Sequence, residues 1–309
     1  MTIRLALDWT PNTNHTGFYV ALAQGLYQKA QVSVVITTPD QDDYQTTPAK
    51  QLSLGQVDLA VAPSESVISY QTNGVPLVAI AALLARDASA IVTLDQSGIE
   101  RPQQLDNRVY GSYSARYEDE IIRQLIRNDG GQGDFKTDKP DRLNLWQALL
   151  DRQVDATWIF LPWEGVEATV KNVELNVFKL EDYGIPYGYS PILMANRDWA
   201  TLHANDLRKF MQATSAGFRW AAEHPDEAAQ LLMDTANHPT LNDSHFLQQS
   251  QRTIASYYLD EEGHWGLMEP AVWEQFIQWL TERQLLTVDA ESNTPLNVKQ
   301  LYTNEFLVE

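Results

Sequence analysis

The sequence contains no cysteine, and this absence excludes several kinds of chemistry. A chain without thiols has no thiolate nucleophile, no disulfide, no cysteine-ligated zinc and no iron–sulfur cluster. The absence does not indicate a compartment, because a protein without thiols behaves alike in oxidising and reducing surroundings.

Positive charge is scarce. The chain has 22 Lys and Arg residues against 41 Asp and Glu residues, which gives a formal net charge of −19. Such a surface repels phosphate polyanions and anionic membranes over the Debye length. We therefore expect no nucleic-acid partner.

Long hydrophobic runs are also missing. No stretch of 18 consecutive apolar residues occurs, so the sequence predicts no transmembrane helix. Met1 leads directly into a strand-like run rather than a basic and then apolar leader. The sequence leaves two locations open: cytoplasmic, or extracytoplasmic (periplasmic or lipoprotein-anchored) after an export signal was trimmed.

Several cofactor and catalytic motifs are absent as well. The chain has no Gly-x-Gly-x-x-Gly after its first strand-like run, no Walker-type loop, no His-Glu-x-x-His and no Gly-x-Ser-x-Gly. Its six histidines show no metal-ligand spacing. We predict no metal site, no cofactor and no catalytic residues.

The hydrophobic pattern alternates between strand and helix periods over the first two thirds of the chain, which is typical of α/β sheets with crossover helices. From residue 198 onward the pattern is almost wholly helical, and we expect this tail to pack on the first sheet. The expected strands are 3–9, 32–36, 57–62, 75–84, 90–94, 108–113, 154–161, 175–180 and 190–195, and the expected helices include 44–55, 64–73, 117–128, 205–222, 226–236, 243–259 and 270–285.

A short internal repeat supports a two-lobed architecture. Residues 51–60 resemble residues 147–156: in each, a short helix and a turn lead through Gln-Val-Asp into an apolar strand. At 309 residues and 44% hydrophobic content, the chain is long enough for two domains. Two similar α/β lobes facing each other would place the carboxyl ends of both sheets on one cleft, where such sheets bind ligands.

The end of the first strand carries two candidate ligand-binding residues. Trp9 offers a flat ring for stacking, and His15 stands at the start of the following helix. Each has a structural alternative, since Trp9 could continue the inward face of the strand and His15 could serve the core or the helix N-terminus.

The segment 157–165 places Trp163 and Glu164 just past a very apolar strand, which we expect to be buried on both faces. A carboxylate beside an aromatic ring suits an amidine-like heteroaromatic, which stacks on the ring and donates N–H groups to the carboxylate. The alternative is a first-turn carboxylate favoured by the helix dipole, and both can hold together.

Two tyrosine clusters, 110–118 and 183–190, occur near other strand ends. The small residues in the first cluster would let a ligand approach a helix N-terminus. Simple loop aromatics are the alternative in both clusters.

The opening of the chain, residues 7–21 with Gly25-Leu26-Tyr27, closely resembles the bacterial formylaminopyrimidine-binding proteins that serve an ABC importer for thiamine precursors. Supporting matches are residues 54–60, 163–165 and 187–191. The resemblance implies an α/β periplasmic-binding-protein fold of the two-crossover type II, with mainly parallel sheets flanked by helices. One lobe would comprise 1–88 and 192–309 and the other 89–191, with the ligand cleft between them.

The same superfamily includes the fungal thiamine-pyrimidine synthases, which use a pyridoxal-phosphate lysine, a sacrificial histidine and a cysteine-rich motif. Aligned on Val57-Asp58, the lysine position falls on Ala62 and the histidine position on Ser66. Without an amine there is no Schiff base, which argues against a synthase.

Three hypotheses remain: a monomeric receptor that delivers an aminopyrimidine to an ABC-transporter permease, a pyrimidine-forming or pyrimidine-processing enzyme, and a receptor for another aromatic or sulfonate-like ligand. We favour the first. By the resemblance, Trp9 stacks on the ring and Glu164 binds the amidine. The full set of candidate ligand-binding residues is Asp8, Trp9, Thr10, His15, Ser64, Tyr113, Glu118, Trp163, Glu164, Tyr187 and Tyr189.

Overall fold

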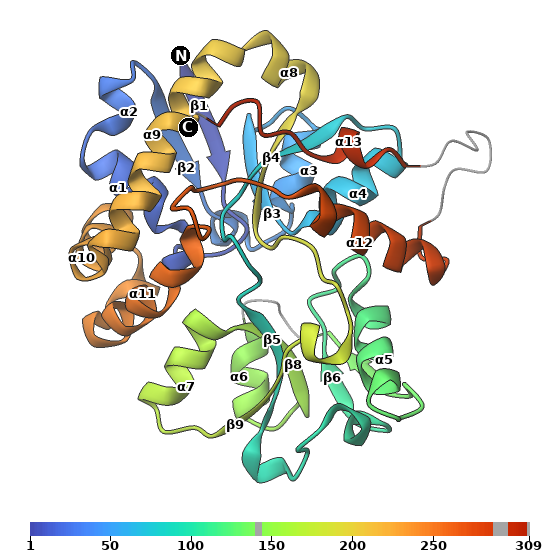
Figure 1. Cartoon of the computed structure of the whole chain (residues 1–309). Helices are drawn as coiled ribbons and strands as arrows, with labels where there is room; N and C mark the ends of the chain where they lie inside the picture. The colour runs from blue at the N-terminus through green and yellow to red at the C-terminus, as the bar shows by residue number, and fades with distance from the viewer. Residues whose placement is uncertain (140–143, 287–295, 308–309) are drawn as a thin grey trace. The chain divides into compact units, whose positions relative to one another are not determined.

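A computed structural model describes residues 1–139, 144–286 and 296–307. The chain divides into two compact units. Unit 1 comprises Met1–Asp87 and Gly188–Glu309, and unit 2 comprises Ala88–Tyr187 (Figure 1).

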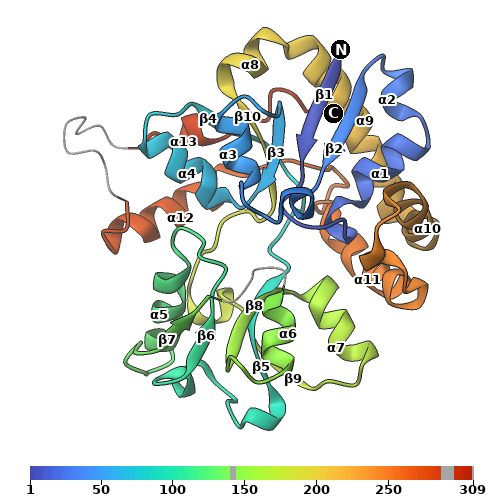
Figure 2. The same cartoon turned by 180° about the vertical axis from the view of Figure 1, so that it is seen from behind.

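Unit 1 contains a five-stranded sheet in the order β2-β1-β3-β10-β4. β1 pairs in parallel with β2 and β3, whereas β10 is antiparallel to both β3 and β4, so four of the five strands share one direction. Figure 2 shows β2, β1 and β3 side by side. The strands are β1 (Thr2–Ala6), β2 (Ser33–Thr37), β3 (Leu59–Ala62), β4 (Leu77–Ala82) and β10 (Ile192–Asn196).

The first strand is shorter than the predicted 3–9. β1 ends at Ala6, and Asp8 and Trp9 lie in a bend. Leu7 still donates its N–H to the carbonyl of Thr37, the last residue of the neighbouring β2. Because β2 ends at Thr37, it offers no further backbone hydrogen bonds to the first strand, and the chain leaves the sheet in a bend.

Helices flank the sheet of unit 1, and the helical C-terminal part of the chain belongs to this unit. The first two helices of unit 1 are separated at Gly25, whose φ of +66° is left-handed. The helices are α1 (Thr16–Ala23), α2 (Leu26–Lys29), α3 (Pro48–Ser53), α4 (Ser64–Thr72), α8 (Arg197–Leu202), α9 (Ala204–Glu223), α10 (Pro225–Ala236), α11 (Ser244–Tyr258), α12 (Pro270–Glu282) and α13 (Val298–Leu301).

Helices α1 and α9 pack with their backbones in close approach, and both figures place them side by side (Figures 1 and 2). A Cβ atom added at Gly217 would lie 2.2 Å from the carbonyl oxygen of Gly17, and one added at Gly17 would overlap the Phe218 ring. Only glycine fits at this crossing, which holds the start of α1 against the tail.

Unit 2 repeats the same sheet plan in the order β7-β6-β8-β5-β9. β6 is parallel to β7 and β8, and β5 is antiparallel to β8 and β9. In each unit the antiparallel strand is the one that enters it from the other unit. The elements are β5 (Ser89–Leu94), β6 (Val109–Gly111), β7 (Lys136–Asp138), β8 (Ala156–Phe160), β9 (Leu175–Phe178), α5 (Glu118–Asn128), α6 (Leu145–Leu150) and α7 (Val166–Val170).

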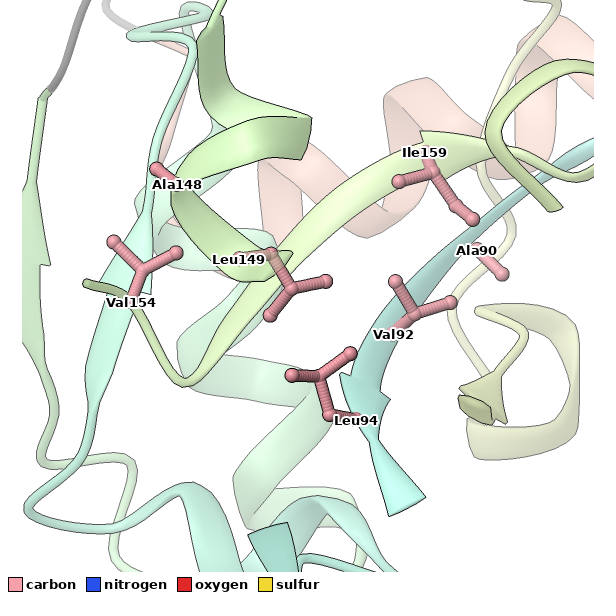
Figure 3. Close-up of a cluster of buried hydrophobic side chains, with 7 residues drawn as sticks. All are labelled: Ala90, Val92, Leu94, Ala148, Leu149, Val154 and Ile159. Carbon is pink, nitrogen blue, oxygen red and sulfur yellow. The ribbon is translucent and has the colours of Figure 1, made fainter. Parts of the chain in front are cut away.

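One hydrophobic cluster in the core of unit 2 lies between α6 and the strands β5 and β8. Figure 3 shows side chains from these three elements converging, with Leu149 at the centre of the group. The cluster consists of Ala90, Val92, Leu94, Ala148, Leu149, Val154 and Ile159.

The internal repeat, residues 51–60 and 147–156, corresponds to equivalent elements in the two sheets. Asp58 precedes β3 and Asp155 precedes β8, and each strand is third in its sheet order. Each aspartate accepts a hydrogen bond at Oδ2 from a backbone N–H of the second strand in the order: Arg4 for Asp58 and Val109 for Asp155, both at 2.8 Å. The repeated Gln-Val-Asp therefore fixes the entry of the third strand in both units.

Candidate functional site

In unit 1, the loop after β1 is held by a buried histidine. His15 has no exposed surface, and its Nε2 lies 2.8 Å from Oδ1 of Asp8. Its Nδ1 accepts the N–H of Asn12 at 3.3 Å, so Nε2 is the nitrogen that donates to Asp8. Both ring nitrogens are occupied by these two contacts, so His15 positions Asp8.

Trp9 is half-buried in this loop, so it does not continue the inward face of the strand. Its ring lies 5.7 Å from the Tyr44 ring at an interplanar angle of 57°. The Tyr44 hydroxyl donates to the carbonyl of Asp8, and the next residue, Thr10, is buried. Trp9 is thus only partly covered, and its indole is of the type that stacks on a flat ligand.

Side chains of α11 form hydrogen bonds with the short 3₁₀ helix η1 (Thr13–His15) and with the residue that follows it. Thr13 Oγ1 lies 2.7 Å from Oγ of Ser250, and Thr16 Oγ1 donates to Gln251 at 2.6 Å. The Tyr258 hydroxyl donates to the carbonyl of Thr13. This buried polar network gives the Thr-Asn-His-Thr stretch of the sequence a structural role, because it fixes the loop that carries Asp8 and Trp9.

Ser64 follows β3, the parallel neighbour of β1, so it lies at the same edge of the sheet as Asp8. Ser64 is fully buried, and its N–H donates to the carbonyl of Tyr189. The Tyr189 hydroxyl accepts the N–H of Glu269 at 2.8 Å, and its ring packs against Trp273. Ser64 and Tyr189 thus connect the return segment to α4 and α12.

In unit 2, Glu118 organises the loop after β6. Its carboxylate accepts hydrogen bonds from the Tyr110 hydroxyl at 2.9 Å and from the Ser112 hydroxyl at 3.0 Å. The backbone N–H groups of Tyr113 and Ala115 donate to it at 3.0 and 2.9 Å. Burial raises the pKa of Glu118, and these four donors oppose the rise. Glu118 therefore holds the half-buried Tyr113 in place.

Glu164 occupies a single π-helical turn, η6 (Leu161–Gly165), between the end of β8 and α7. π-turns are rare and occur often at functional sites. Phe160 donates its N–H to Oε2 of Glu164 at 3.0 Å. Although the residue as a whole is half-buried, burial of its carboxyl raises the pKa of Glu164 to about 7. Hydrogen bonds from backbone N–H groups oppose this rise, and the Glu167 carboxylate adds to it.

The expectation that the strand before Glu164 is buried on both faces is wrong. Ile159 is buried in the core, whereas Trp158 and Phe160 on the other face of β8 are only half-buried. The Trp158 ring lies 5.0 Å from the ring of Tyr187, which is also half-buried. Sequence reasoning selected Tyr187 but missed Trp158, whose alternation with Ile159 was the available signal.

The candidate residues thus form four local groups. Asp8, Trp9 and His15 lie together after β1, with Thr10 beside them, and Ser64 contacts Tyr189 after β3. In unit 2, Tyr113 and Glu118 lie together after β6, and Trp163 and Glu164 follow its parallel neighbour β8. The remaining candidate, Tyr187, lies outside these four groups, and its ring contacts that of Trp158.

Neither a metal centre nor a membrane span is found in the part of the chain that the structure describes. No group of three or more His, Asp or Glu side chains within residues 1–139, 144–286 and 296–307 could hold a metal ion. No helix within these ranges is long and apolar enough to cross a membrane.

Two mixed sheets of the same order, flanked by helices and followed by a helical C-terminal part, define a periplasmic-binding-protein fold. The alkanesulfonate-binding protein SsuA from Xanthomonas axonopodis pv. citri, solved with MOPS bound, shares this fold with a TM-score of 0.69 at 13% identity over 98% of both chains. The predicted fold class is confirmed.

The chain belongs to the NMT1/THI5-like family, whose pattern it matches over residues 12–228. It is 23% identical over 283 residues to the formylaminopyrimidine-binding protein of Halalkalibacterium halodurans, covering 90% of this chain and 84% of that protein. It is also 26% identical over 236 residues to the 4-amino-5-hydroxymethyl-2-methylpyrimidine phosphate synthase of Legionella pneumophila, covering 74% and 72%. The resemblance seen in the sequence is confirmed at the level of the family, which contains both binding proteins and synthases.

Proposed function

We propose that this chain is a solute-binding protein that captures an aminopyrimidine precursor of thiamine and presents it to an ABC-transporter permease. The observation that carries the proposal is Glu164: a buried carboxyl in a π-turn at the carboxyl end of β8, next to Trp163. The similarity to a formylaminopyrimidine-binding protein supports the same ligand class.

The chemistry of the site fits a flat amidine-like heteroaromatic. An aminopyrimidine presents an exocyclic amino group next to a ring nitrogen, and a carboxyl group can hydrogen-bond both at once. Half-buried aromatic side chains supply stacking faces: Trp9 with Tyr44 in unit 1, and Trp158 with Tyr187 in unit 2. That a cleft between the lobes brings these groups onto one ligand stays a prediction.

The charge of the site favours this ligand over an anion. The segment 156–170 contains two glutamates and no lysine, arginine or histidine. Helix α5 begins with Glu118, Asp119 and Glu120, which offset the positive end of its dipole. Segment 156–170 thus offers a sulfonate no cationic side chain, and the acidic start of α5 repels it, so the third hypothesis is disfavoured for anionic ligands.

A pyrimidine synthase is the second candidate, because synthases occur in the family. The position aligned with their lysine is Ala62, the last residue of β3, and the position aligned with their histidine is Ser66 in α4. Since Ala62 has no amine, pyridoxal phosphate should give no internal-aldimine absorbance with this protein. A borohydride-trapped adduct at one specific lysine would support the synthase instead.

Titration calorimetry with N-formyl-4-amino-5-aminomethyl-2-methylpyrimidine tests the proposal, with MOPS as the sulfonate comparison. We expect saturable one-to-one binding of the pyrimidine and none of MOPS. Native mass spectrometry of the purified protein for a co-purifying aminopyrimidine provides an independent check. Binding of MOPS without binding of the pyrimidine would refute the proposed ligand class.

The remaining expectations depend on this function. A receptor that serves an importer works outside the cytoplasm, with the permease as its partner, and we predict that it does so as a monomer. Fractionation of the producing cells tests the location, cross-linking to a co-expressed permease tests the partner, and the mass of the purified protein in native mass spectrometry tests the monomeric state.

A further inference from the structure

Within the part of the chain that the structure describes, no cationic side chain forms an ion pair with the carboxyl of Glu164. Among the described residues, its hydrogen-bond donors are backbone N–H groups, those of Phe160 and of Glu164 itself. The charged side chain that acts on it is Glu167, which carries the same sign and is itself ion-paired with Lys171 one helical turn on. A buried carboxyl in such surroundings prefers its neutral form.

The local backbone also fixes the orientation of the Glu164 carboxyl. The N–H of Phe160 occupies Oε2 at 3.0 Å and comes from the last residue of β8, so the carboxyl is tied back to the strand end. A carboxylic acid tied in this way still offers one O–H donor and one acceptor lone pair. An aminopyrimidine offers the complement: a ring nitrogen that accepts and an amino group that donates.

We propose, on the basis of the proposed function, that Glu164 binds a weakly basic heteroaromatic amidine as a pair that holds one proton, so that ligand binding takes up a proton above neutral pH. The acid O–H donates to the ring nitrogen, and the exocyclic amino group donates to the other oxygen. If the proton transfers from the carboxyl to the ring nitrogen, the O–H bond breaks as the N–H bond forms, and the pair becomes a carboxylate and a pyrimidinium. The total charge of the pair is zero in either form.

The pairing makes affinity depend on pH in a defined direction. Above neutral pH the free protein loses the Glu164 proton, which must be recovered from solvent before the pair can form. With a pKa of about 7 for the free carboxyl, affinity should fall about 50-fold between pH 7 and pH 9. A carboxylate that simply accepted N–H groups from a neutral ligand would show affinity that is constant or rises over this range.

Calorimetry with N-formyl-4-amino-5-aminomethyl-2-methylpyrimidine at pH 8 measures the proton directly. The observed enthalpy is compared between phosphate, which has a small ionisation enthalpy, and Tris, which has a large one. We expect uptake of about 0.9 proton per ligand bound by the native protein. Glu164→Gln keeps the size and the hydrogen-bonding pattern of the acid but cannot titrate, so its uptake should be near zero and its affinity constant from pH 7 to pH 9.

Glu181→Gln is the matched control, because Glu181 is an exposed carboxylate of the same unit. It should retain the proton uptake of the native protein. The measurement on the native protein decides the inference even if Glu164→Gln folds poorly.

The possible failures are distinct. Binding of the pyrimidine with no proton uptake, or uptake that persists in Glu164→Gln, would overturn this inference and leave the proposed function in place. No binding of the pyrimidine at any pH would overturn the proposed function and this inference with it.

Discussion

Replacement of Glu164 by glutamine should stabilise the ligand-free protein above pH 7. The perturbation removes the charge of a carboxyl whose pKa burial raises from 4.5 to about 7. Glutamine is nearly isosteric and can still accept the N–H of Phe160 through its amide oxygen. The effect on unfolding should therefore arise from the charge and not from a lost hydrogen bond.

The sign follows from proton binding. Between pH 4.5 and pH 7 the folded protein holds the Glu164 proton while the unfolded chain releases it, so the free energy of unfolding falls as pH rises through this window. At about 1.4 kcal/mol per pKa unit, the rise costs the folded protein on the order of 3 kcal/mol above pH 7. Below pH 4.5 the carboxyl is protonated in both states and the cost disappears.

Urea unfolding of the native protein and Glu164→Gln at pH 4, 6 and 8 measures the difference. The free energies of unfolding should diverge as pH rises, with the variant more stable by on the order of 3 kcal/mol at pH 8. Titration of the glutamate carboxyl carbons by NMR would locate the pKa itself. Parallel pH dependence of the two proteins, or a carboxyl that titrates near 4.5, would refute the reasoning.

Three further substitutions test other parts of the structure. Trp9→Ala should lower ligand affinity by about tenfold or more while costing only ~1–2 kcal/mol of stability, because Trp9 is half-buried against Tyr44; a large drop in melting temperature with normal affinity in calorimetry would place Trp9 in the core instead. Gly217→Ala should lower the melting temperature strongly, by an unfolding cost of about 3 kcal/mol or more, since the new Cβ would lie 2.2 Å from the Gly17 carbonyl; an unchanged calorimetric melting curve would contradict the close packing of α1 and α9. Glu118→Ala should destabilise unit 2 by about 3 kcal/mol, because its four donors lose their acceptor, and retained hydrogen-exchange protection in the loop after β6 would show that Glu118 does not organise it.

The sequence by itself determined the fold class and most helices. Its alternating periods predicted α/β architecture, and the start and end of α5 and the helical tail followed from local apolar spacing. The repeated Gln-Val-Asp pointed to two similar sheets because it encodes a local event, the entry of one strand, which occurs once in each unit. The opening motif identified the family because it is a contiguous stretch.

Strand order depended on the tertiary structure. Nothing near Ile192 in the sequence indicates that β10 inserts between β3 and β4 and runs antiparallel to both. This pairing joins segments more than a hundred residues apart, and local propensity carries no information about it. The end of β1 at Ala6 was decided in the same way, by where β2 stops offering partners.

The same distinction between sequence and tertiary structure holds for the candidate site. The sequence placed Glu164 and Trp163 past an apolar strand, since both follow that strand directly. Only the tertiary structure decided that His15 is fully buried and hydrogen-bonded to Asp8, and that Trp158 is half-buried. Burial of a side chain is set by what packs on it from distant segments, such as α11 over the His15 loop, and hydrophobic periodicity reports a face of an element without saying whether another element covers it.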